Sequence, residues 1–222
     1  LPQLLGAPGI AFNTNNYKGD QFTSWGDLWK PEFANKIQLL DDAREVFNIA
    51  LLKLGKNPNT TDPEEIKAAY EELKKLRPNV LSFSSDNPAN SFISGEVSVG
   101  QLWNGSVRIA KKEQAPIDMV FPKEGPVLWV DTLAIPANSK NKENAHKLIN
   151  YLLSAKVSEQ LTLAIGYPTS NMKALEVLPK EITQDPAIYP TQKVLQESQW
   201  QDDVGDAIEL YEKYYQELKA SK

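Results

Sequence analysis

Short apolar runs alternate with longer amphipathic segments along most of this chain, and this alternation constrains its fold more than any other feature. The runs that indicate strands lie at 10–12, 37–40, 97–103, 117–121 and 127–135. The segments with helical periodicity lie at 24–29, 43–54, 62–76, 106–113, 142–153, 155–165 and 204–219. Strands that alternate with helices are typical of an α/β architecture, which is the fold class that we expect.

Local signals sharpen some of these boundaries. Asp62 precedes Pro63, which predicts an N-cap followed by a first-turn proline, and Glu65 would complete a capping box. The Pro-rich stretch 168–190 carries no such signals, and we expect it to be irregular. The run 127–135 is too long and apolar to lie at the edge of a sheet.

Composition excludes several functional classes. The chain carries 24 basic and 29 acidic residues, a net charge of −5, which argues against a nucleic-acid-binding surface. It has no cysteine, and His146 is its single histidine, so we expect no thiol chemistry, no metal site and no cofactor. No stretch is long and apolar enough to predict a transmembrane segment.

Motifs for catalysis are missing as well. The chain has no G-x-S-x-G, no P-loop and no G-x-G-x-x-G motif, and His146 lies off the apolar stripe of its helix. Asp42 and Glu45 could resemble the acid pair of a glycosidase. Two carboxylates on one helical turn share a face, however, whereas a glycosidase needs its acids on either side of the scissile bond. We therefore predict no catalytic residues and no enzyme activity.

Asp42 and Glu45 also have a purely structural interpretation. Asp is a favoured N-cap, and Glu three residues later is the usual capping-box partner. This interpretation does not exclude a ligand-binding one, because a capping carboxylate keeps lone pairs that an incoming ammonium group could use.

Aromatic residues supply the second candidate feature. Trp129 and Asp131 share one face of their strand because side chains alternate along it, and Trp103 ends another strand just before an Asn-Gly turn. An indole beside a carboxylate suits a cation on an alkyl stem. The structural alternative is a tryptophan packed in the core beside an aspartate whose hydrogen-bond partners all lie within the protein.

Seven stretches identify a resemblance that covers nearly the whole chain. They are Ser24–Glu32 (SWGDLWKPE), Asp41–Phe47 (DDAREVF), Ser85–Asn90 (SDNPAN), Trp103–Ser106 (WNGS), Leu133–Ala137 (LAIPA), Ile165–Thr169 (IGYPT) and Trp200–Val204 (WQDDV). In order and spacing they resemble the family of periplasmic spermidine/putrescine-binding proteins that serve the polyamine ABC importers of bacteria.

The resemblance implies a fold and a domain organisation. The family has the type II periplasmic binding protein fold, with two α/β lobes and a ligand cleft between them. This chain would hold the C-terminal lobe in two parts, 6–130 and 176–222, together with the return segment of the N-terminal lobe, 131–175. It would lack most of the N-terminal lobe.

The resemblance also implies ligand-binding residues. They are Asp42, Glu45, Ser85, Trp103, Trp129, Asp131, Tyr167 and Gln201. Asp42 and Glu45 resemble the acids that take a terminal ammonium, and Asp131 the acid that meets a second or internal nitrogen. Ser85 and Gln201 resemble polar contributors, and the three aromatic residues resemble the walls of the site.

From this resemblance we expect a periplasmic receptor that binds polyamines and delivers them to a membrane permease. The alternative is a related receptor for another small solute, such as an amino-alcohol or a sugar. Without most of one lobe, the chain should bind polyamines weakly or not at all. Residues 131–175 should then expose apolar faces and an unpaired strand edge, and we expect self-association through this segment.

Overall fold

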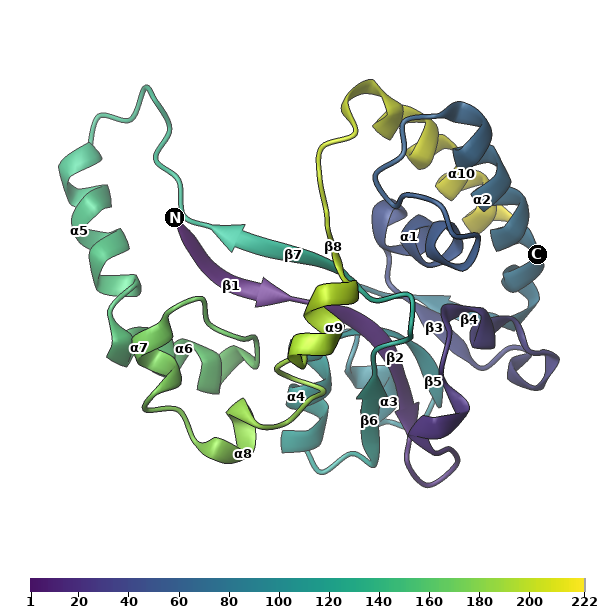
Figure 1. Cartoon of the computed structure of the whole chain (residues 1–222), viewed down its shortest axis with the longest axis horizontal. Helices are drawn as coiled ribbons and strands as arrows, with labels where there is room; N and C mark the ends of the chain where they lie inside the picture. Colours follow the sequence, from purple (N-terminus) through teal and green to yellow (C-terminus); the bar gives the residue numbers. More distant parts are fainter. Residues whose placement is uncertain (222) are drawn as a thin grey trace.

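The structure is a computed structural model that describes residues 1–221. Its larger sheet has five strands in the order β4-β3-β5-β2-β6 (Figure 1). These strands span Val80–Phe83, Ile37–Leu39, Val99–Trp103, Pro8–Asn13 and Ile117–Val120, respectively. β3 pairs in parallel with β4 and β5, whereas β2 runs antiparallel to β5 and β6. The expected α/β class is confirmed.

Helices cover both faces of this sheet because its strands are apolar on both sides. Along β2, Ile10 and Phe12 join one core cluster and Ala11 joins the other. The first cluster lies under α1 (Ala43–Lys53), α2 (Pro63–Leu76) and α10 (Ile208–Ala220). The second lies under α3 (Asn90–Ile93) and α4 (Asn104–Lys112). We call the five-stranded sheet with these helices the lobe.

A second sheet leads away from the lobe (Figure 1). It has the order β1-β7-β8, with bounds Pro2–Gly6, Val127–Thr132 and Gln199–Trp200. β1 runs antiparallel to β7, and β8 runs parallel to it. β7 lies between two strands only at Val127 and Leu128. From Trp129 to Thr132 its one strand partner among residues 1–221 is β1, so the expectation that this run avoids a sheet edge holds only for its start.

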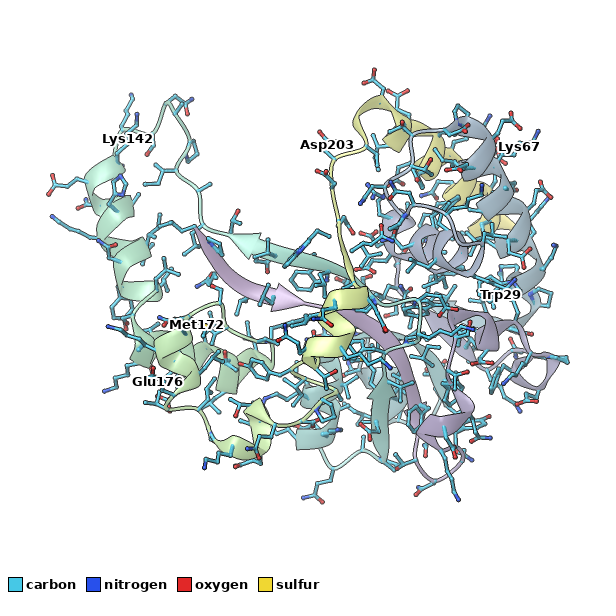
Figure 2. All side chains as sticks on the ribbon, viewed as in Figure 1. Trp29, Lys67, Lys142, Met172, Glu176 and Asp203 are labelled. Atoms are coloured by element: carbon cyan, nitrogen blue, oxygen red, sulfur yellow. The ribbon has the colours of Figure 1, made fainter. Side chains whose placement is uncertain are left out.

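Beyond this second sheet lie helices α5 (Lys142–Leu152), α6 (Ala155–Ile165) and α7 (Met172–Leu175). We call β1, β7 and these helices the arm. Figure 2 shows its position, with Lys142 at the far end of the arm and Lys67 on the opposite side of the molecule. α8 (Lys180–Thr183) and α9 (Gln192–Glu197) return the chain toward β8. None of the described helices is long and apolar enough to cross a membrane.

The outer edge of β1 is not open. The Leu5 amide donates to the Pro168 carbonyl over 2.9 Å, and the Ser170 amide donates to the Gln3 carbonyl over 3.1 Å. The segment after α6 therefore covers the outer edge of β1. Within 131–175, where an unpaired edge was expected, Asp131 and Thr132 of β7 pair with β1 on one side, and β8 reaches only Val127 and Leu128 on the other side.

Several boundaries differ from the prediction. The run at 127–135 stops being a strand at Thr132, where its pairing with β1 at Pro2 ends. The stretch 168–190, expected to be irregular, contains α7 and α8. The segment 24–29 is a 3₁₀ helix at Trp25–Trp29. The short connecting 3₁₀ turns are Gly19–Gln21, Pro31–Phe33, Arg77–Asn79 and Gly205–Ala207.

Candidate ligand-binding site

A cavity of about 400 Å³ lies where the lobe meets the second sheet. It is lined by Asp42, Glu45, Trp103, Trp129, Val130, Asp131, Tyr167 and Gln201. The start of α1, the end of β5, β7 and the segments after α6 and β8 each contribute to this lining. The structure thus brings together all but one of the residues that the sequence nominated.

The two acids of α1 have different surroundings. Asp42 is the N-cap, and its Oδ1 accepts a hydrogen bond from the Glu45 amide over 3.0 Å, as predicted. The side chain of Glu45 does not return to the Asp42 amide, so the capping box is not closed. Instead, Glu45 Oε1 accepts a 2.8 Å bond from the Trp103 indole across the sheet. Asp42 is exposed, whereas Glu45 is 4% exposed.

Burial changes the acidity of Glu45. Loss of hydration raises the pKa of its carboxyl to about 8, and the negative charge of Asp42 adds to this effect. The Trp103 hydrogen bond and the nearby Arg44 act in the opposite direction. Burial also raises the pKa of the Tyr167 phenol. Both shifts favour the protonated, uncharged forms of Glu45 and Tyr167 at neutral pH.

Three aromatic rings line the cavity in sequence. The Trp103 and Trp129 rings meet edge to face, with centroids 6.3 Å apart and an interplanar angle of 85°. The Trp129 and Tyr167 centroids lie 5.4 Å apart. Such rings can pack against methylene groups and attract a cation over their faces. The predicted aromatic walls thus form a continuous surface.

Two glycines hold these walls in place. A Cβ at Gly6 would lie 1.9 Å from the Trp129 ring, and a Cβ at Gly105 would lie 2.5 Å from the Tyr167 ring. Because real Cβ atoms never approach so closely, each ring needs a glycine beneath it. Gly6 pairs with Trp129 across the β1–β7 ladder, so the ring lies over the strand opposite.

Of the remaining predicted residues, two line the cavity and one does not. Asp131 is exposed on the same side of β7 as Trp129. Gln201 follows β8, and its backbone N–H donates to the Leu128 carbonyl over 2.8 Å. Ser85 does not line the cavity. It lies after β4, and its buried hydroxyl has no hydrogen-bond partner among residues 1–221.

Sequence reasoning missed other residues of the site. Val130 lines the cavity, and Gln101 lies behind it, fully buried on β5. The Gln101 amide donates to the Glu45 carbonyl over 2.9 Å and lies 3.4 Å from Glu45 Oε2. Its place two residues before Trp103 on an alternating strand was the available signal.

The described part of the chain contains no group of three or more His, Cys, Asp or Glu side chains that could hold a metal ion. The cavity itself offers carboxylates, indole and phenol rings, and an amide. This chemistry suits a ligand with positive charges joined by apolar segments.

Comparison with known proteins agrees with this geometry. A family model described as bacterial extracellular solute-binding protein matches residues 6–191. The chain is 80% identical over 222 residues to spermidine/putrescine-binding periplasmic protein 1 of Haemophilus influenzae, covering 100% of this chain and 62% of that protein. It is 52% identical over 222 residues to the spermidine/putrescine-binding periplasmic protein of Escherichia coli, covering 100% of this chain and 64% of that protein.

A solved structure extends the comparison to the fold. The spermidine/putrescine ABC transporter substrate-binding protein from Streptococcus pneumoniae aligns with a TM-score of 0.84 at 30% identity, over 99% of this chain and 68% of that one. The type II periplasmic binding protein fold expected from the sequence is confirmed. The chain spans less than two thirds of the length of the two curated relatives. With the family model matched from Gly6 to residue 191, the chain belongs to the bacterial extracellular solute-binding proteins.

Proposed function

We propose that this chain is the polyamine-binding part of a periplasmic receptor. The receptor binds spermidine or putrescine, leaves it chemically unchanged, and delivers it to the permease of an ABC importer. The names of the H. influenzae and E. coli relatives support both the ligand class and the periplasmic location.

One observation carries the proposal: carboxylates from two separate elements meet a continuous aromatic surface in one cavity. Asp42 and Glu45 come from α1, and Asp131 comes from β7. A polyamine places ammonium groups at fixed separations along a methylene chain. Carboxylates can take the ammonium groups while the rings pack the methylenes between them.

The expected energies are sufficient for a useful affinity. A charge-assisted hydrogen bond contributes about 1.5–3 kcal/mol, and a cation–π contact contributes about 0.5–2 kcal/mol. A few such contacts together reach the roughly 8 kcal/mol that micromolar binding requires. This estimate holds only where water is excluded, since exposed ion pairs contribute about 0–1 kcal/mol.

This condition bears on the chain by itself. We propose that 6–130 and 176–222 form one lobe of the receptor and that 131–175 returns from the other lobe. Asp42, Val130, Asp131 and Gln201 are exposed in the cavity. The chain alone should therefore bind polyamines weakly, and a second lobe that covers the cavity should restore binding.

We also propose that the chain alone self-associates through residues 131–175. Leu148 and Tyr151 on α5 are 57% and 62% exposed, so the arm presents an apolar face. Apolar faces of this kind drive association. The expected contact is packing of α5 against a second copy, and Asp131 and Thr132 of β7, which pair with β1 on one side only among residues 1–221, offer a second surface.

Calorimetric titration with spermidine tests the function. It compares this chain with a completed chain, in which the part of the H. influenzae relative outside the match is joined to it. We expect micromolar binding by the completed chain and at least tenfold weaker binding by the chain alone. Glucose and ethanolamine, added as competitors, test a receptor for another solute. A completed, folded chain that ignores spermidine and putrescine would overturn the proposal.

A further inference from the structure

Glu45 is a buried carboxyl that forms no ion pair within residues 1–221. Its Oε1 accepts from the Trp103 indole over 2.8 Å, and its Oε2 lies 3.4 Å from the Gln101 amide nitrogen. Both donors are neutral. A carboxylate buried in this way is costly unless it is protonated or a cation arrives.

The charged groups around Glu45 favour the proton. On α1 itself, Asp42 adds negative charge, and β7 contributes Asp131 to the same cavity. The segment after α6 contributes Tyr167, which is neutral, and β5 contributes only uncharged side chains. Burial is the largest cause of the raised pKa of Glu45, and the negative charge of Asp42 adds to it.

The positive charge of Arg44 lowers the pKa of Glu45, but the Arg44 guanidinium donates its hydrogen bonds to other groups. Its Nη2 donates to Asn59 Oδ1 over 2.8 Å and to the Pro58 carbonyl over 3.3 Å. Its Nη1 donates to the Asp202 carbonyl over 3.2 Å. The guanidinium therefore anchors two loops and leaves the Glu45 carboxyl without an ion pair.

Gln101 is suited to hold a carboxyl that changes its protonation state. It is fully buried, its Nε2 bonds the Glu45 carbonyl, and its Oε1 has no partner in the described chain. A carboxamide carries a donor and an acceptor, so it can donate to a carboxylate or accept from a carboxylic acid. As placed here, its Nε2 joins the first turn of α1 to β5 through the Glu45 carbonyl and presents a donor to Glu45 Oε2. Accepting from the acid would require the amide to turn over and release that carbonyl.

We propose that a cation entering this cavity displaces the proton of Glu45, and that Gln101 is the positioning residue for this exchange. The inference rests on the proposed function and specifies how the same site is regulated. An alkylammonium meets the Glu45 carboxylic acid, an ammonium–carboxylate pair forms, and one proton passes to solvent. No electrons are transferred and no covalent bond of the ligand changes.

The exchange makes binding depend on pH. Aliphatic ammonium groups titrate near pH 10, so putrescine keeps its charges between pH 5.5 and about 7.5. Over this window the dissociation constant should fall by up to about tenfold for each unit of pH. The effect should level off above pH 8, where Glu45 is already ionised.

Calorimetry can count the released protons directly. Putrescine is titrated into the completed chain at pH 6.5 in phosphate and in imidazole, two buffers with different ionisation enthalpies. We expect close to one proton released per ligand in the wild type and none from Glu45→Gln. Wild-type binding without proton release would overturn this inference and leave the proposed function intact. No binding in either buffer would instead overturn the proposed function.

A second variant tests Gln101. Gln101→Met keeps the volume but removes the donor and the acceptor, and Gln184→Met at an exposed site is the matched control. We expect Gln101→Met to weaken putrescine binding at least fivefold at pH 6 and less at pH 8. Equal weakening at both pH values would assign Gln101 a merely structural role and overturn its part in the proposal. The proton count in the wild type does not depend on this variant's stability.

Discussion

Helix α2 of the lobe and helix α5 of the arm both carry an apolar stripe, but the two stripes lie in different surroundings. In α2, Ile66 and Leu73 are at most 1% exposed. In α5, only Ile149 is buried, and Leu148 and Tyr151 are more than half exposed. Similar sequence patterns have therefore produced one core helix and one helix with an open apolar face.

The two core clusters show the same contrast at larger scale. Among the described residues, their members come from the lobe, from its connecting and returning segments, and from Val127 at the start of β7, and none comes from 131–175. The arm is instead connected by backbone bonds along β1 and by side chains such as Asn171, whose amide donates to the Leu153 carbonyl over 2.7 Å. An amphipathic pattern specifies a helix and its apolar face, whereas burial depends on what else is present.

The largest expected effect compares matched leucines in the two helices. Leu73→Ala in α2 should lower the free energy of unfolding by about 3–5 kcal/mol, because a buried side chain is lost and a cavity remains. At concentrations where the chain is a monomer, Leu148→Ala in α5 should change it by less than about 0.5 kcal/mol, because the side chain is exposed there. Urea unfolding of both variants at low protein concentration measures the difference. A large loss for the monomer would contradict this contrast, whereas a loss that grows with protein concentration is what self-association through α5 predicts.

The second comparison is between a buried and an exposed acid. The folded state keeps Glu45 protonated up to its raised pKa of about 8, whereas the unfolded chain loses that proton at lower pH. Wild-type stability should therefore fall as the pH rises through this interval, by up to about 1.4 kcal/mol per unit. Glu45→Gln should remove this slope. Glu176→Gln on the surface of the arm is the control and should leave the slope unchanged. Parallel stability curves for the wild type and Glu45→Gln would contradict the prediction.

Asp131 tests the contribution of β7, the strand of the arm that lines the cavity beside the lobe. In the completed chain, Asp131→Asn should weaken spermidine binding at least tenfold, or about 1.4 kcal/mol, because the shape is kept and the charge is removed. Asp20→Asn, at an exposed site outside the cavity, is the control. Calorimetry gives the affinity and thermal unfolding the stability. Unchanged values of both would make Asp131 structurally and functionally neutral.

The smallest expected effect concerns ion pairs. Asp41 accepts bonds from Lys219 Nζ and from the Tyr215 hydroxyl, each over 2.6 Å, and these bonds lower its pKa. Asp41→Asn should cost about 1 kcal/mol or less at pH 7, since the carboxyl is partly exposed. The difference should shrink as the pH falls below about 4, the ordinary value for Asp, and vanish below the lowered pKa of Asp41. Glu143→Gln, which breaks the exposed pair with Lys147 in the arm, should cost still less. Equal losses at pH 7 and pH 3 would contradict the assignment.

Much of the fold could be predicted because its signals are local. Helix α2 begins after Asp62 and ends at Leu76, as its N-cap, proline and periodicity indicated. β1 and β4 were missed, since a short strand is defined by its partner rather than by its own residues. α7 and α8 were missed because four residues are too few to show helical periodicity.

The sequence predicted most of the residues that line the site, but it did not predict which residues they contact. Asp42 was identified as an N-cap from its neighbours alone, and the structure confirms it. Glu45 forms its hydrogen bonds with β5, more than fifty positions away in sequence, so the expected capping box was wrong. Gln101 makes that same long-range contact. Alternation along β5 places it on the same face as Trp103, but it does not show which residue of α1 it meets.

The glycines beneath the aromatic rings set a limit on how this cavity can be redesigned. Gly6 with Trp129, and Gly105 with Tyr167, each form a unit in which a larger residue on one side requires a smaller one on the other. A library that varies only the lining side chains would place new side chains over Gly6 and Gly105 without changing the glycines themselves. One that varies each glycine separately would contain mostly inactive members. New ligand specificities are therefore reached most directly by changing both members of a unit in the same step.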